Sequence, residues 1–342
     1  MEKNRTPNID RRELLKEMAN YQQPTKWKSI WQLANTLIPY GVLYYAAYRS
    51  LDYSFLITLP LMILLAGFIT RTFIIFHDCG HGSFFNSKRA NSFWGNITGI
   101  LTFTPFHYWR DSHNRHHATS GNLDKRGEGD IWMLTLEEYL EAPRMVRIKY
   151  RLYRNPIVMF LLGPLLITLV SNRYAGQGAS RSDWLSVTFT NAAIAVIITL
   201  TVITLGWKAF LFIQLIPILI AHIGGVWLFY IQHQFEGVYW KRDYEWNFVN
   251  ASLQGGSFYK LPAVLRWFSG SIGYHHVHHL NSRIPNYNLN RCQKNVKTLQ
   301  ITKPIGIGLS LKSMFFRLWD EENDKLISFR EIKRRRYRSA LD

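Results

Sequence analysis

Four long apolar stretches constrain the fold of this 342-residue chain more than any other feature of its sequence. They cover residues 30–48, 54–76, 184–206 and 209–231. Each is long enough to cross ~30 Å of hydrocarbon as an α-helix. Residues 206–208 leave room only for a tight turn, so the last two stretches predict a helical hairpin. We therefore expect an all-α integral membrane protein with four long transmembrane helices.

Three shorter apolar segments are ambiguous, because stretches of roughly 10–14 residues are more often interfacial or re-entrant than spanning. They are residues 93–106, 157–170 and 261–272. Two arginines precede the middle segment and two follow it, namely Arg151, Arg154, Arg173 and Arg181. The positive-inside rule therefore places both of its ends in the cytoplasm. Six spans remain an alternative if two of the short segments cross.

The apolar stretches divide the chain into two transmembrane hairpins and a cytosolic cap. The predicted parts are a cytosolic segment 1–28, a first hairpin 29–76, a cap piece 77–183, a second hairpin 184–232 and a cap piece 233–342. With four spans both termini and the cap lie on one side, and the basic N-terminus makes that side cytoplasmic. The first 28 residues are polar, so we expect no cleavable signal peptide. The predicted location is the cell membrane, with several spans.

The net charge of +18 indicates an anionic partner. Residues 283–342 carry 14 Lys and Arg against 6 Asp and Glu, ending in a basic run at 333–338. No nucleic-acid-binding motif accompanies this charge, so we expect no nucleic acid and favour the membrane surface plus an acidic protein. A solvated tail is the alternative for the last dozen residues. Only two cysteines are present, which fits a reducing compartment.

Three clusters of histidine carry the chemistry of the sequence. The clusters are His77 and His81, then His113, His116 and His117, then His275, His278 and His279. Spacings of i, i+4 and i, i+3, i+4 place the members of each cluster on one helix face. Eight imidazoles are too many for one metal ion and about right for two. Imidazole suits Zn, Cu, Fe or Ni, but a structural zinc site needs four ligands and usually includes cysteine.

The position of the first cluster fixes the height of the predicted metal site. If the second apolar helix continues past Arg71, with that side chain snorkelling to the interface, His77 and His81 stand ~9–15 Å beyond it. The metals then lie just above the bilayer surface, which suits a long flexible acyl chain drawn upward from the membrane.

The residues around these clusters resemble the membrane-bound fatty-acid desaturase family over most of the chain. The resemblance is carried by residues 77–84, by 121–124 after the second cluster and by 278–287 after the third. It is strongest to bacterial acyl-lipid desaturases of the cold-inducible Δ5 type. It implies that the eight clustered histidines bind two iron ions and that His233 is a further ligand. An Asn that some animal relatives place four residues earlier is Phe229 here.

The resemblance also implies the reaction and its partners. Two ferrous ions would activate O2 and remove two hydrogens from a phospholipid acyl chain, leaving a cis double bond at Δ5. The chain has no haem-binding or flavin fingerprint, so we expect an external electron carrier such as ferredoxin or flavodoxin. A di-iron hydroxylase or ketolase acting on an alkyl or carotenoid substrate is the alternative enzyme. A metal transporter is disfavoured, because the histidines lie outside the predicted spans and no repeat is visible.

Several other polar residues are candidates for supporting roles. Metal-bound histidines usually donate their second ring N–H to a partner. Five acids could accept it, or could be surface charges beside the arginines: Asp78, Asp111, Asp124, Asp130 and Glu236. His222 lies three helical turns before His233 and is a candidate for the substrate channel, with helix packing as the alternative. We expect His107 to be interfacial, His276 to lie outside the ligand set and Cys79 to pack.

Overall fold

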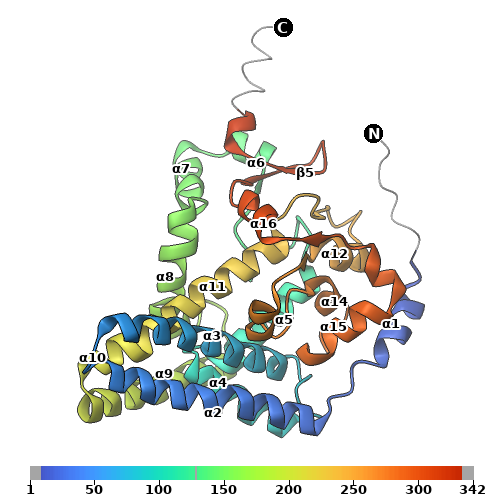
Figure 1. Cartoon of the computed structure of the whole chain (residues 1–342). Helices are drawn as coiled ribbons and strands as arrows, with labels where there is room; N and C mark the ends of the chain where they lie inside the picture. Colours follow the sequence, from blue (N-terminus) through green and yellow to red (C-terminus); the bar gives the residue numbers. More distant parts are fainter. Residues whose placement is uncertain (1–8, 128, 333–342) are drawn as a thin grey trace.

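The first apolar hairpin forms as expected. A computed structural model describes residues 9–127 and 129–332 of the chain, most of them helical (Figure 1). Helix α2 (Lys26–Ser50) turns back into α3 (Phe55–Gly80). The Ser54 side chain caps α3 by accepting a hydrogen bond from the Leu56 N–H, and the Ser50 and Thr58 hydroxyls lie 2.8 Å apart across the turn.

The second hairpin contains the predicted tight turn. Helix α9 (Arg181–Leu205) ends at Gly206, whose φ of +87° is readily adopted only by glycine. The returning helix runs from Trp207 to His233 through α10 (Trp207–Ala209), η3 (Phe210–Leu215) and α11 (Ile216–His233). This long helix delivers His233 to the cap.

Three helices in the described residues are long and apolar enough to cross a membrane: α3, α9 and Trp207–His233. Helix α2 has the predicted length but is not among them, because Gln32, Asn35 and four tyrosines dilute its apolar character. A bent pair is a further candidate. It joins α7 (Arg144–Tyr153) at 65° to residues 158–173, which include η1 (Val158–Leu162), α8 (Gly163–Leu169) and η2 (Ser171–Arg173). The number of spans therefore stays a prediction.

The two predicted cap pieces pack together. Helix α5 (Phe106–Thr119) comes from the first piece; α12 (Phe248–Gly255), α14 (His275–Leu280) and α15 (Asn286–Asn295) come from the second. The N-terminal α1 (Arg11–Ala19) joins them, burying Leu14 and Met18 in the same apolar cluster as Val277 and Leu289. Figure 1 shows α1, α12, α14 and α15 grouped on one side of the molecule.

Short strands correct the expectation of an all-helical cap. Strand β1 (Leu134–Thr135) pairs with β4 (Leu318–Asp320), which pairs with β5 (Lys325–Ile327). Strand β2 (Phe258–Tyr259) pairs with β3 (Pro304–Ile305). Strands of two or three residues are too short to leave an alternating pattern in a sequence. The β1–β4 pair links the two cap pieces directly, with α6 (Leu136–Glu141) following β1 and η4 (Lys297–Ile301) and α16 (Ile307–Ser313) preceding β4. The basic run 333–338 lies outside the described residues.

The two remaining short apolar segments form helices beside α3. Residues 93–106 lie mostly in α4 (Lys88–Leu101), and residues 261–272 contain α13 (Ala263–Phe268). Arg71 corrects one expectation. Instead of snorkelling, it is buried, lies 3.8 Å from the Trp267 ring centre and donates hydrogen bonds to the Thr36 hydroxyl and the Trp267 carbonyl. Because the Thr36 hydroxyl and the Trp267 carbonyl accept its hydrogen bonds, the Arg71 guanidinium is satisfied without extending to the membrane interface.

Substitution of Arg154 tests the packing between the end of α7 and the second cap piece. Its side chain is fully buried and donates hydrogen bonds to the Trp132 and Phe316 carbonyls and to Gln234 Oε1. Arg154→Met removes the donor to the Trp132 carbonyl and to Gln234 Oε1, at about 1–3 kcal/mol each, whereas the Phe316 carbonyl still accepts from the Tyr230 hydroxyl. We expect the thermal midpoint in detergent to fall markedly, whereas Lys149→Met, on the exposed face of the same helix, should change little. Equal midpoints in both variants would contradict this role.

Candidate metal centre

Four helices bring the predicted histidines to one place. Helix α3 continues past the apolar stretch and carries His77, with His81 just after its last residue. One helical turn separates the two, and their ring centres lie 4.7 Å apart. Helix α5 carries the second cluster, α14 the third, and α11 ends at His233.

The nine histidines gather into two groups, in each of which one ring nitrogen per residue lies within 4.8 Å of the others. The five-histidine group is His77, His81, His113, His117 and His278. The four-histidine group is His116, His233, His275 and His279. The second and third sequence clusters are therefore each divided between the two groups. Neither group contains a cysteine or an acid.

The ring nitrogens within each group face one another. Nε2–Nε2 distances of 2.9–3.2 Å join His77 to His113, His113 to His117, His116 to His233 and His233 to His275. In a neutral imidazole one ring nitrogen carries a hydrogen and the other carries a lone pair. A ring nitrogen that faces two other ring nitrogens therefore cannot form a good hydrogen bond with both of them. In addition, His81 Nε2 and His279 Nε2 are buried and have no hydrogen-bond partner in the described chain.

Burial keeps these rings in the form that binds metal. Desolvation lowers the pKa values of His113, His117, His278 and His279 well below the usual range for histidine, and the neighbouring rings lower them further. The neutral rings thus present converging lone pairs in a buried space. This arrangement fits two metal ions, one in each group, and imidazole is a good ligand for iron, copper and zinc.

Two of the five acids considered from the sequence contact a histidine. Asp130 Oδ1 lies 2.7 Å from His116 Nδ1, and Asp78 Oδ1 lies 3.3 Å from His77 Nδ1. Asp78 also accepts hydrogen bonds from the backbone and side-chain N–H groups of Asn286, which tie α15 to α3. Such acceptors fix the orientation of a ligand ring and raise its basicity.

The other three acids lie elsewhere, as the surface-charge alternative requires. Asp111 pairs with Arg110, Asp124 pairs with Arg242, and Glu236 is exposed. Asp111 and Asp124 are thus paired with arginines rather than with imidazoles, and Glu236 lies on the surface.

The acceptor near His233 could not have been predicted. Its Nδ1 lies 3.2 Å from the Gly255 carbonyl, and a backbone carbonyl leaves no signal in a sequence.

Three further histidines lie outside both groups: His107, His222 and His276. His276 is buried, with its Nε2 2.6 Å from Gln293 Oε1, and its ring is turned away from the ligand set. His107 is half-buried at the start of α5, where its backbone N–H donates to the Ser186 hydroxyl. Cys79 is buried in an apolar cluster with Phe76 and Phe84.

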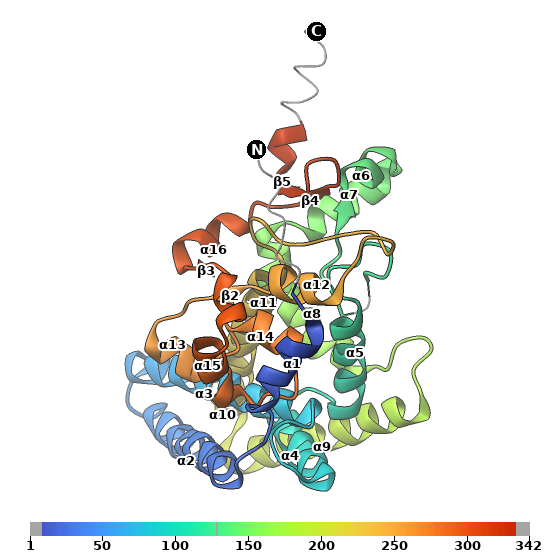
Figure 2. The same ribbon diagram turned by 90° about the vertical axis from the view of Figure 1, so that its right-hand side faces the viewer.

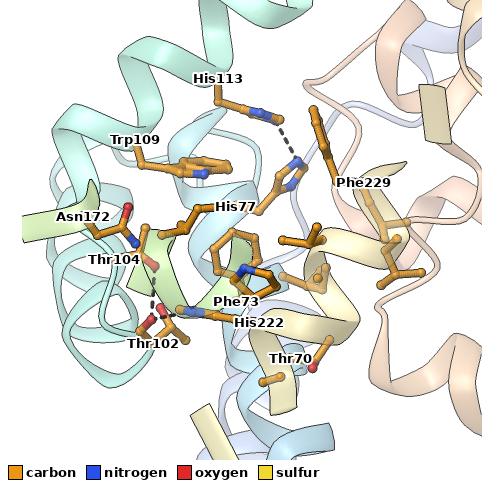
Figure 3. A pocket seen from close by; sticks show the side chains of 18 of the residues that line it. Thr70, Phe73, His77, Thr102, Thr104, Trp109, His113, Asn172, His222 and Phe229 are labelled. Atoms are coloured by element: carbon orange, nitrogen blue, oxygen red, sulfur yellow. Dashed lines mark hydrogen bonds between the residues drawn. The ribbon is translucent and has the colours of Figure 1, made fainter. Parts of the chain in front are cut away.

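A cavity of about 520 Å³, which we call the apolar cavity, leads from the membrane helices to the histidines (Figure 3). It lies mainly between α3, α5, α8 and α11. His77, His113 and His275 line it near the metal centre. Most of the remaining lining is apolar and includes Phe73, Trp109, Ile167, Val226 and Phe229.

His222 lies in the wall of the apolar cavity, where the sequence placed its substrate-channel candidate. Its Nε2 lies 3.0 Å from the Thr102 carbonyl, and its Nδ1 contacts the Thr168 hydroxyl. Both ring nitrogens therefore contact neighbouring segments, as the packing alternative expects, and the substrate-channel role of His222 stays a prediction. Phe229 also lines the cavity, and its ring packs against His116 and His233 of the four-histidine group.

Comparisons with known proteins agree with this geometry. Residues 54–303 match the fatty acid desaturase family model. The chain is 49% identical to a fatty acid desaturase of Bacillus subtilis (strain 168) over 322 residues, 94% of this chain and 92% of the relative. It is 29% identical to an sn-1 oleoyl-lipid 12-desaturase of Picosynechococcus, covering 70% of this chain and 69% of the relative. It is 26% identical to an sn-1 acyl-lipid omega-3 desaturase (ferredoxin) of Synechocystis, covering 66% and 64%.

Asp130 tests whether a carboxylate supports the metal centre. Removing it as Asp130→Ala frees the His116 ring and should weaken metal binding about 10–100-fold, the usual effect of losing such a partner. Asp124→Ala, which removes a carboxylate of the same cap that contacts no histidine, is the matched control. Chelator competition on the purified protein measures both affinities. The same affinity in the two variants would remove Asp130 from the metal centre.

Proposed function

The chain belongs to the fatty acid desaturase family, and on that premise we propose that it introduces a cis double bond at Δ5 of an acyl chain in a membrane glycerolipid. One observation carries the proposal: an apolar cavity opens among the membrane helices and ends at His77 and His113 of a buried, all-imidazole site. Its volume of about 520 Å³ falls within the range of small-molecule sites, roughly 300–1,000 Å³.

We assign two iron ions to the two histidine groups. When bound, they would supply the O2-activating redox chemistry that breaks unactivated C–H bonds. The overall reaction balances as one O2, two electrons from a carrier, two protons and two hydrogens from neighbouring carbons, giving one double bond and two water molecules. Because one relative is named for ferredoxin, we favour ferredoxin or flavodoxin as the carrier.

The residues of the chain position the substrate and keep water out. The apolar cavity offers an acyl chain surroundings as apolar as the bilayer it leaves, so the shape of the cavity and not hydrophobic burial selects and positions the chain. Phe73, Trp109 and Phe229 line the cavity next to the histidines. Their flat rings restrict the chain to a narrow path and exclude solvent from the reacting carbons. The membrane orientation, with the histidines on the cytoplasmic side of the cell membrane, is part of the same proposal.

Expression in a host with saturated acyl chains tests the activity directly. Gas chromatography and mass spectrometry, after derivatisation of double bonds, should find a new Δ5 mono-unsaturated species. His77→Ala, His117→Ala and His279→Ala should each abolish it while the protein still inserts into the membrane. A hydroxylated product instead would contradict desaturation, and a double bond elsewhere would contradict Δ5. Activity retained in one of the variants would remove that histidine from the ligand set.

Gly225 tests the assignment of the apolar cavity to the acyl chain. It lines this cavity, and an added Cβ meets no atom within 4 Å. Gly225→Leu should fill part of the space, lower activity on long chains about tenfold and shift the product towards shorter chains. Gly224 is the matched control, because its added Cβ also meets no atom, yet this residue does not line the cavity. Acyl-chain profiling of both variants should show the shift only for Gly225→Leu. The same profile in both would disprove the assignment.

A further inference from the structure

A second cavity reaches the metal centre from another side. This polar cavity has a volume of about 480 Å³ and is lined mainly by hydrophilic residues. His81 is the one member of the two histidine groups in its lining, whereas the apolar cavity contacts His77, His113 and His275. The end of α3, the start of α4, part of α5 and Arg283 surround the polar cavity. The five-histidine group is therefore approached by two chemically different spaces.

Aromatic rings stand between the two cavities. Trp109 lines the apolar cavity and Phe106 lines the polar one. The Phe76 ring contacts both, with ring centres 4.8 Å from Trp109 and 5.6 Å from Phe106. An acyl chain in the apolar cavity is thus screened from the polar cavity. The linings of the two cavities share no residue, so the polar cavity is not a continuation of the acyl-chain path.

The two histidine groups differ in their access to solvent. In the five-histidine group His81, His113 and His117 are partly exposed, whereas all members of the four-histidine group are buried. A protein partner that needs to approach a metal closely therefore finds the shortest route at the five-histidine group. His81 lines the polar cavity and is the ring of this group that a partner docked there would approach.

Positive charge surrounds the mouth of the polar cavity. Lys88 and Arg283 line it, are exposed and form no ion pair among the described residues. Arg110 also lines it, paired with Asp111 at 2.8 Å. The mouth therefore carries three positive side chains and one carboxylate, that of Asp111, which leaves a net positive charge. Such a surface attracts an acidic protein, speeds its encounter and orients it.

We propose that the polar cavity is the docking site of the reduced electron carrier, an acidic iron–sulfur or flavin protein, and that electrons enter the metal centre beside His81. This inference rests on the proposed function. Each docked carrier is oxidised by one electron and leaves, so two dockings supply the two electrons of one turnover. No covalent bond forms between the partners, and the two protons come from water.

Charge reversal at the mouth tests the proposal with the full chain in lipid nanodiscs and a purified bacterial ferredoxin. The double variant Lys88→Glu, Arg283→Glu should raise the Kd for ferredoxin about tenfold or more and remove most of its salt dependence. The rate of metal reduction by dithionite, a small reductant that needs no docking, should stay unchanged. The matched control is Lys303→Glu, Lys312→Glu, which reverses two exposed charges at and near α16, away from α4 in Figures 1 and 2. It should leave the Kd nearly unchanged.

Zero-length cross-linking gives a readout that does not depend on turnover. A carbodiimide joins a lysine amine to a carboxylate in direct contact, so mass spectrometry should find Lys88 linked to ferredoxin and Lys312 unlinked. Links confined to the basic run at 333–338, or an unchanged Kd in the double variant, would overturn the docking site. So would a change in the KM for lipid without a change for ferredoxin, which would indicate a headgroup site. If the unaltered chain, reduced by dithionite, forms no double bond, the proposed function fails instead.

Discussion

The convergence of nine imidazoles on two points is the constraint on which the rest of the structure depends. Ring nitrogens lie 2.9–3.2 Å apart, and His81 Nε2 and His279 Nε2 are buried with no hydrogen-bond partner among the described residues. This arrangement fits cations between the rings. Because the histidines come from four helices, each of these helices must end at the two groups or pass beside them. The long membrane helices α3 and α11 bring His77 and His233 upward, and the cap helices α5 and α14 bring the rest. Outer contacts such as Asp130 to His116 hold the rings in orientation.

This arrangement separates two tasks in space. An apolar cavity among the membrane helices leads to His77 and His113, and a polar, positively charged cavity leads to His81. The aromatic rings of Phe76, Phe106 and Trp109 lie between them. Under the two proposals, an apolar substrate and an acidic electron carrier would reach the same histidines without competing for one entrance. The five-histidine group, which the polar cavity reaches, is partly exposed, whereas the four-histidine group is buried.

The sequence predicted the helical class, the hairpins and the positions of the clustered histidines, because each leaves a local signal in apolar length or helical spacing. His233 belongs to none of the three clusters, and the other histidine of α11, His222, lies three helical turns away. Only family resemblance therefore pointed to His233 as a ligand. The division of the second and third clusters between two groups depends on how four helices face each other, which spacing along one helix cannot reveal. The pairing of Asp124 with Arg242 could not be predicted either, because the two residues are 118 positions apart in the sequence. Arg71 was expected to extend to the membrane interface, but it is buried and donates a hydrogen bond to the Thr36 hydroxyl, an acceptor that its own helix does not reveal.

X-ray absorption at the iron edge, combined with metal analysis of the purified chain, tests the central claim most directly. The account predicts about two irons per chain, each in a shell of nitrogen ligands, with no sulfur neighbour, since neither group contains a cysteine. Loss of His279 should remove metal from the four-histidine group first. A single metal per chain, a sulfur ligand, or zinc in both positions of an active preparation would contradict the account.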